Sequence, residues 1–317
     1  MRTLGLITTS DQLTFRFIPT FLQRLLWPKL LNLLTAKFKR VVYEEKEPAE
    51  LNIKIRIARL PFTHEQLNTI SADVLEDFCG SIVGQFQQEA VNHLVLPNHI
   101  KENKSIYRRV YKEGDFRKFD GKDLFIALIP DVLKKVCKNA GKDLSHISIG
   151  IAEQYFTEKS LFIVKMLSSS VKFMTLATKE REDARKHMES ICEDTGLAVW
   201  VSDDVGNALK EADIIFVLDP FERFLKRAAV NRNAILFNLS DQTHIEQNIR
   251  NRVVDHINIL AARKLKTALA ALGLEADEEL TECLVVLGLH ETFDKPGIRY
   301  YQRLRQAFYN LGCKVNA

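Results

Sequence analysis

The segment with the clearest chemical meaning is a short strand followed by a turn, Ile149–Phe156 (IGIAEQYF). In a dinucleotide-binding turn, glycines let the chain turn tightly and let its backbone approach a diphosphate. The N-terminus of the following helix then offers N–H donors and partial positive charge to the phosphates. Chemistry of this kind would make the segment part of a cofactor site.

This turn lacks two of the glycines that such a site uses. Gly150 matches the first position, the second falls on Glu153, and the third falls on Phe156. A carboxylate at the second position would crowd a phosphate and repel it by on the order of a few kcal/mol. We favour an interpretation in which Glu153 interacts with the dipole of its own helix, worth roughly 0.3–1 kcal/mol, so that the protein occupies its own anion site.

The adenosine side of such a site is better preserved. Thr178, Lys179 and Arg181 follow the next predicted strand, and basic residues there suit a 2′-phosphate. They alternate with acidic residues, so a solvated start of a charged helix explains them equally well. Asp219 ends a later strand, where a doubly wound sheet opens its ligand crevice. The candidates for cofactor binding are therefore Gly150, Glu153, Thr178, Lys179, Arg181 and Asp219.

Short apolar strands alternate with helices through the middle of the chain, and this pattern predicts a parallel sheet covered on both faces. The expected strands are His146–Ala152, Lys172–Ala177, Leu197–Ser202, Asp213–Leu218 and Ala234–Leu239. Right-handed crossovers make this a doubly wound fold, Rossmann-like in type. Because Pro130 disfavours helix at Ile129, Asp123–Ile129 could be a strand, with the helix beginning at Asp131.

The chain of 317 residues suggests about two domains. We expect a smaller α/β domain over 1–120, the Rossmann-like domain over 121–257, and helices over 258–317. The terminal helices could pack back on the N-terminal domain or against a second subunit. A net charge of +4 is too small to indicate nucleic acid.

The five cysteines form no CxxC pair and share no metal-ligand spacing with the histidines. With no export signal at the N-terminus, we expect reduced thiols and a cytoplasmic protein. Charges and prolines interrupt the apolar segment Phe15–Phe38, so a helix buried by its apolar face is favoured over one lying on a membrane.

Four patches resemble the nicotinamide-binding domain shared by shikimate dehydrogenases and glutamyl-tRNA reductases. They are FDGKDLFIAL, GKDLSHISIG, LATKEREDARKH and ALKEADIIFVLDP, between residues 119 and 220. A more specific resemblance is to predicted amino-acid dehydrogenases and fatty acyl-carrier-protein reductases. It adds the N-terminal GLITTS and the tail TECLVVLGLHETF with LGCKV.

The resemblance implies catalytic groups that this chain does not clearly supply. The lysine and aspartate of the shikimate enzymes match no motif here, and Lys101, Lys104 and Asp120 are candidates by rough location alone. The nucleophilic cysteine of the acyl reductases falls on Glu279, so Cys283 is interpreted as a buried structural residue. No catalytic residue is assigned, and whether the chain is an enzyme stays open.

These observations favour a Rossmann-like protein with a degenerate dinucleotide site, either non-catalytic or binding a different ligand, a small molecule or a protein. No cofactor and no metal are expected in that case. The alternative is an NAD(P)-dependent oxidoreductase of the shikimate or amino-acid/acyl dehydrogenase type with an atypical phosphate turn, which would use NADP or NAD.

Overall fold

The computed structural model places the chain in two compact units, Met1–Asp120 with Arg263–Leu287, and Gly121–Ala262 with Gly288–Ala317. It describes residues 2–9, 40–48, 53–67, 69–96, 100, 103, 106–107, 109–110, 114–219, 230–240, 251–270, 278–288 and 297–316. The apolar segment Phe15–Phe38 and an expected helix over Phe221–Ala229 lie outside the described residues.

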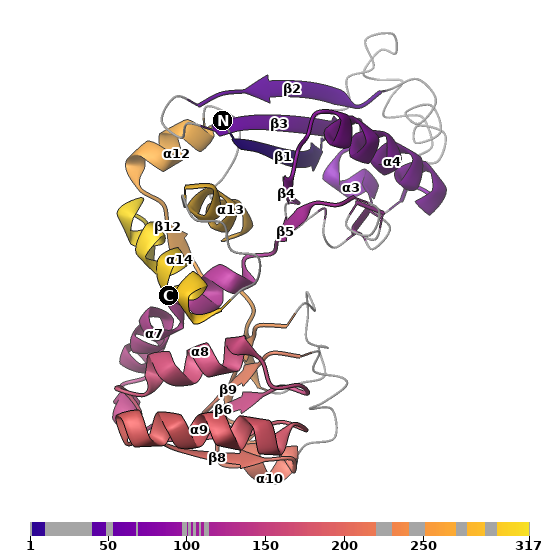
Figure 1. Cartoon of the computed structure of the whole chain (residues 1–317). Helices are drawn as coiled ribbons and strands as arrows, with labels where there is room; N and C mark the ends of the chain where they lie inside the picture. Colours follow the sequence, from indigo (N-terminus) through magenta and orange to yellow (C-terminus); the bar gives the residue numbers. More distant parts are fainter. Residues whose placement is uncertain are drawn as a thin grey trace. The chain divides into compact units, whose positions relative to one another are not determined.

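The first unit is built on a five-stranded sheet of order β2-β3-β1-β4-β5 (Figure 1). Its strands are β1 (Arg2–Thr9), β2 (Val42–Lys46), β3 (Ile53–Leu60), β4 (His93–Val95) and β5 (Arg117–Phe119). Strand β2 is antiparallel to β3, and the other pairs are parallel. Strands β1, β3 and β4 contain apolar runs that are typical of strands, whereas β2 and β5 are charged and carry no such signal.

One amphipathic helix supplies much of the core of this unit. Helix α4 (Ala72–Gln88) buries Leu75, Cys79, Ile82 and Phe86, which pack against apolar side chains of the sheet. This spacing places them on one helical stripe. The unit also contains α3 (His64–Leu67), α12 (Arg263–Ala270) and α13 (Glu278–Gly288).

The second unit contains a parallel sheet of six strands in the order β11-β10-β9-β6-β7-β8. The strands are β6 (Ile149–Ala152), β7 (Phe173–Ala177), β8 (Ala198–Ser202), β9 (Ile214–Val217), β10 (Ile235–Asn238) and β11 (Arg252–Val254). This is the strand order of a Rossmann fold, with the reversal of order between β6 and β9. The predicted doubly wound α/β fold is confirmed. A small antiparallel pair, β12 (Ile259–Leu260) and β13 (Lys314–Val315), adds to this unit.

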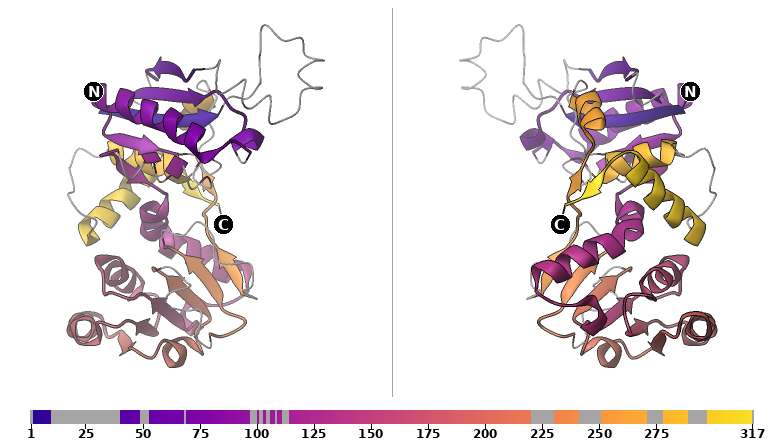
Figure 2. Two further views of the ribbon diagram at one scale, coloured as in Figure 1. Left: turned by 90° about the vertical axis from the view of Figure 1, so that its right-hand side faces the viewer. Right: turned by 90° about the vertical axis from the view of Figure 1, so that its left-hand side faces the viewer.

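Helices cover this sheet from two sides (Figures 1 and 2). Right-handed crossovers place α8 (Glu158–Leu167) and α9 (Arg181–Thr195) on one face and α10 (Val205–Leu209) on the other. Helix α10 has Asp204 as its N-cap, and the Asp204 side chain accepts a hydrogen bond from the Asn207 N–H. Helix α9 ends at Gly196, whose φ of 74° is typical of a glycine that ends a helix.

The predicted strand at Asp123–Ile129 is wrong, because α7 (Lys122–Asn139) is one continuous helix that contains Pro130. Its residues from Leu124 to Pro130 are all buried. A helix that is apolar on every side shows no 3.6-residue periodicity, so the segment resembled a buried strand in sequence. The proline is tolerated in this buried setting although it removes one backbone hydrogen bond.

The C-terminal helix α14 (Ile298–Asn310) belongs to the second unit. Arg305 forms paired hydrogen bonds with the Asp131 carboxylate of α7, at 3.0 Å from Nε and 3.2 Å from Nη2. The Tyr301 ring packs 4.7 Å from the Phe162 ring of α8, and its hydroxyl lies 3.2 Å from the Asp123 carboxylate. The end of the chain therefore covers α7 and α8. A short 3-10 turn, Leu144–His146, leads from α7 towards β6.

Candidate functional site

The candidate site is the turn that joins β6 to α8, residues Glu153–Thr157. It leaves the carboxyl end of β6, next to β9, where the strand order of the sheet reverses. In open α/β sheets ligands bind in the crevice at this point. The structure therefore places the predicted turn where a dinucleotide would lie in a fold of this type.

Carboxylates of the protein itself accept hydrogen bonds from two backbone N–H groups of this turn. The Gln154 N–H donates to Oδ2 of Asp219, which follows β9. The Phe156 N–H donates to Oε2 of Glu180 at 2.8 Å. Both N–H groups are the kind of donor that a bound phosphate would use. The sequence placed Asp219 in the crevice but gave Glu180 no role.

Glu153 is completely buried in this turn, at 0% exposure. Its Oε2 accepts a hydrogen bond from the Thr157 hydroxyl at 2.9 Å, and its Oε1 has no partner among the described residues. Burial raises the pKa of Glu153 to about 7, hydrogen bonds from Ser160 and Thr157 oppose the rise, and the Asp219 charge adds to it. Thr157 is the N-cap residue of α8, so this carboxyl group lies at the start of that helix.

The carboxylates give the turn an electrostatic character opposite to that of a phosphate site. A diphosphate entering here would find the N–H groups of this turn already bonded to the carboxylates of Asp219 and Glu180. Like charges repel at short range, more strongly beside the buried Glu153 than at Glu180, which is exposed to solvent. The arrangement can accept hydrogen bonds or hold a proton on Glu153, but it offers little to an anion.

Gly150 lies inside β6 and not in the turn. A Cβ atom at this position would lie 2.5 Å from Cδ2 of Leu209 and 3.3 Å from Cβ of Ala212. A side chain here would force the buried Leu209 to shift, so the close packing of α10 and the chain that follows it on the sheet favours glycine. This role is independent of any ligand.

The three residues expected near an adenosine have different environments in the structure. Thr178 is buried, and its Oγ1 accepts from the Glu180 N–H at 3.3 Å and lies 3.4 Å from the Gln154 carbonyl. Lys179 and Arg181 are exposed at the start of α9. Thr178 thus links the turn after β7 to the turn after β6, whereas the two basic side chains face solvent.

A buried polar network at the carboxyl end of β10 was missed by sequence reasoning. The Lys122 ammonium donates to the carbonyl oxygens of Asn238 at 2.8 Å and Asp255 at 3.0 Å. The Asn238 amide donates to the Asp255 carboxylate at 2.7 Å, and Ser240 donates to the Asn238 side-chain oxygen at the same distance. Lys122 therefore links the start of α7 by hydrogen bonds to the carboxyl ends of β10 and β11. No local signal marks it, because its partners lie more than a hundred residues away.

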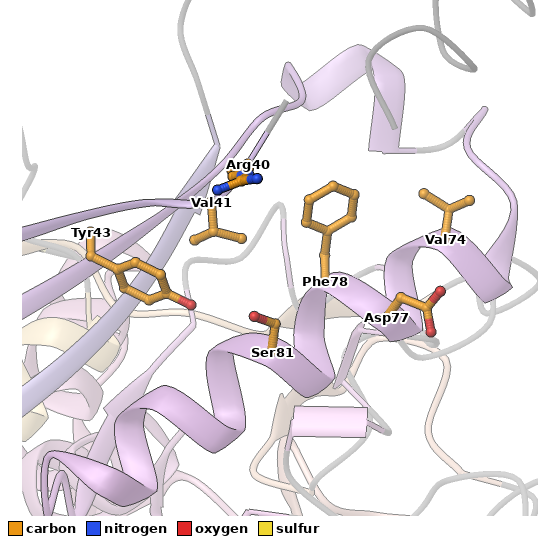
Figure 3. Close-up of a pocket in the computed structure, with 7 residues that line it drawn as sticks. All are labelled: Arg40, Val41, Tyr43, Val74, Asp77, Phe78 and Ser81. Atoms are coloured by element: carbon orange, nitrogen blue, oxygen red, sulfur yellow. The ribbon is translucent and has the colours of Figure 1, made fainter. Parts of the chain in front are cut away.

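The first unit contains a separate pocket of about 440 Å³ between the start of β2 and helix α4 (Figure 3). Its described lining consists of Arg40, Val41, Tyr43, Val74, Asp77, Phe78 and Ser81. Tyr43 and Ser81 share a hydrogen bond between their hydroxyls, and burial raises the pKa of Tyr43. This volume is within the usual range for small-molecule sites, and none of the predicted cofactor residues lines it.

The cysteines are free thiols, of which four are buried and Cys192 is exposed. Cys283, the candidate from the resemblance, is fully buried, which raises its pKa well above the ordinary value. No group of histidine, cysteine and carboxylate side chains among the described residues is arranged to hold a metal ion. Within the same residues, no helix has the length and apolar character needed to cross a membrane.

Comparisons with known proteins find no matching family model and no matching curated sequence. Among solved structures, the chain is similar to L-tryptophan dehydrogenase from Nostoc punctiforme, with 11% identity, a TM-score of 0.34, and coverage of 98% of this chain and 80% of that one. It is also similar to shikimate 5-dehydrogenase from Listeria monocytogenes, with 12% identity, a TM-score of 0.31, and coverage of 80% and 85%.

The chain is similar at the same level to ornithine transcarbamoylase from Giardia lamblia, with 11% identity, a TM-score of 0.32, and coverage of 79% of this chain and 76% of that one. Enzymes of different chemistry therefore resemble the chain to an equal degree. Likeness at this level carries no argument about function, and the fold assignment stands on the strand order itself.

Proposed function

We propose that this chain is a Rossmann-like protein whose dinucleotide site has degenerated, and that it acts as a non-catalytic binding module or binds a different ligand. The observation that carries the proposal is the pairing of the turn's own N–H groups with Asp219 and Glu180. These donors would have to leave their carboxylate partners before they could bind a phosphate.

Glu153 supports the same proposal. Its buried carboxyl group fills space at the start of α8, where the second glycine of a dinucleotide motif would leave room for the ligand. Gly150, the one glycine retained, is explained by its contact with Leu209. Glu153 and Gly150 are therefore accounted for without a cofactor.

The pocket beside α4 offers a place for the different ligand that the proposal allows. Phe78, Val74 and Val41 provide apolar surface, while Arg40 and Asp77 provide charge at its rim. Ligand sites commonly combine a mainly apolar lining with a few polar groups. This feature supports a small molecule as the ligand class and leaves its identity open.

The second candidate is an NAD(P)-dependent oxidoreductase, and one observation favours it. Lys179 and Arg181 are exposed after β7, where a 2′-phosphate binds in cofactor-dependent members of this fold. In that case NADP would be preferred over NAD, and the β6–α8 turn would have to rearrange when the cofactor binds.

Calorimetric titration of the full chain with NADPH and with NADH separates the two candidates. We expect no binding tighter than millimolar for either, and low-micromolar binding would overturn the proposed function.

Replacing Glu153 by glycine should raise the affinity for dinucleotide, because it removes both bulk and charge. Glu158→Gln, an exposed change in the first turn of the same helix, should leave the affinity unchanged.

A further inference from the structure

The outer strand β8 of the six-stranded sheet lacks the features that usually keep a sheet edge from pairing. In the described part of the chain, the other outer strands of the two large sheets all carry charge: β11 has Arg252, β2 has Glu44 and Glu45, and β5 has Arg117. Strand β8 reads AVWVS, with neither charge nor proline. Charged side chains and prolines are the common protection of edge strands. No described strand pairs with the outer backbone edge of β8, so this edge is open to another strand.

Two large aromatic side chains are exposed on one face of this edge. Phe173 pairs in register with Ala198, and Thr175 pairs with Trp200, so Phe173 and Trp200 lie on the same face. They are 44% and 41% exposed, respectively. Helix α10 packs on this face near Gly150 and Thr175, but it is only five residues long and leaves both rings in contact with water.

Exposed charges next to this edge are separated along the strand direction. Lys172 and Lys210 lie towards the amino-terminal ends of the strands, with Glu211 beside them, and Asp203 and Asp204 lie at the carboxyl end of β8. An antiparallel copy of β8 would bring the carboxyl end of one strand to the amino-terminal end of the other. The two aspartates of each copy would then face the two lysines of its partner.

The opposite face, which carries α9, shows the reverse separation. The helix runs back along the sheet, so its last residues lie near the start of β8. Its C-terminal half contains the acidic Glu189, Glu193 and Asp194, and its N-terminal half contains Arg181, Arg185 and Lys186 together with Glu182 and Asp183. An antiparallel two-fold arrangement would place the acidic half of one α9 beside the more basic half of the other.

We propose that a second copy of this chain is the partner of this surface, and that two copies pair through antiparallel β8 strands into one continuous sheet. Phe173 and Trp200 of both copies would then be covered in the centre of the interface. A two-fold axis fits because the charges at the strand ends and the charges along α9 are complementary under that one operation. The proposal is independent of the function proposed above.

Sedimentation of the full chain tests the association directly. The expected particle has about twice the chain mass of 36.4 kDa, in a concentration-dependent equilibrium with monomer. Trp200→Lys should weaken dimerisation at least about tenfold, because it places like charges together at the strand pair. Leu260→Lys, a change at another exposed apolar residue of the same unit, should have no effect. A wild-type chain that stays monomeric at its solubility limit, or a dimer insensitive to Trp200→Lys, would overturn the proposal.

A charge exchange tests the antiparallel register with changes that leave the core untouched. Lys172 and Asp203 are both exposed, so their variants should fold normally. Lys172→Asp and Asp203→Lys should each weaken the dimer several-fold. The double variant should recover the wild-type dissociation constant, because each interface again pairs acid with base. Failure of the double variant to recover contradicts the antiparallel pairing and with it the proposed interface.

Discussion

Glu153 is a carboxyl group held out of water, with one oxygen bonded to Thr157 and the other without a partner among the described residues. Burial is the main cause of its pKa of about 7, compared with an ordinary 4.5. An ionised carboxylate here would lie beside Asp219 in a region of low dielectric, so the folded state retains the proton more strongly than the unfolded state does.

This difference predicts that folding stability falls as the pH rises from about 4.5 to about 7, and that it levels off above that range. The unfolded chain releases the proton near 4.5 and the folded chain near 7, so deprotonation favours unfolding between the two values. At about 1.4 kcal/mol for each tenfold change in proton affinity, the loss is about 3 kcal/mol.

Glu153→Gln should remove this component of the pH dependence, so its advantage over wild type should grow from pH 5 to pH 8. Urea denaturation at several pH values would measure it. Glu158→Gln, at an exposed position of the same helix, should keep the wild-type slope. An unchanged slope in Glu153→Gln would show that Glu153 is already ionised at pH 5 in the folded protein.

At the scale of elements, close packing of α10 on the sheet explains the retained glycine of the turn motif. Gly150→Ala should destabilise the protein by about 1–3 kcal/mol, because a Cβ atom would lie 2.5 Å from Leu209. Thermal denaturation would measure the change. Gly84→Ala in α4, where nothing lies within 4 Å of the added atom, should be neutral or stabilising. Equal stability of Gly150→Ala and wild type would contradict the packing explanation.

Elements with a clear pattern of apolar residues in the sequence were predicted well, and elements without such a pattern were not. The central strands β6, β7 and β9 are buried apolar runs between helices, and helix α9 is amphipathic, so their positions followed from the pattern. The first half of helix α7 is buried on every side and was mistaken for a strand. Strands β2 and β11 are short and partly polar, and they form because a neighbouring strand offers hydrogen bonds.

The candidate site was predictable in position but not in its contacts. A strand–turn–helix pattern is sufficient to locate Glu153 and the turn. The pairing of Phe156 with Glu180, or of Lys122 with Asn238, depends on how distant segments meet in three dimensions. An acidic residue just after β7 was the one available signal for Glu180, and the sequence reasoning treated it as solvated charge.

At the scale of the whole molecule, the end of the chain stabilises the Rossmann-like unit. Tyr301 in α14 is completely buried against Phe162 of α8. Tyr301→Ala should therefore destabilise the protein by about 3–5 kcal/mol, the usual cost of removing a large buried aromatic ring. Tyr309→Ala, on the same helix but 40% exposed, should cost much less. Chemical denaturation of both variants would compare them, and similar losses would argue against α14 as a structural cover.

The central claim is that two N–H groups of the β6–α8 turn, those of Gln154 and Phe156, are already bound by the protein's own carboxylates. Amide resonances of Gln154 and Phe156, followed by NMR during addition of NADPH to the full chain, test it most directly. We predict that both resonances stay where they are up to millimolar NADPH, with their amide protons protected by Asp219 and Glu180. Saturable shifts of both amides at micromolar NADPH would contradict the account.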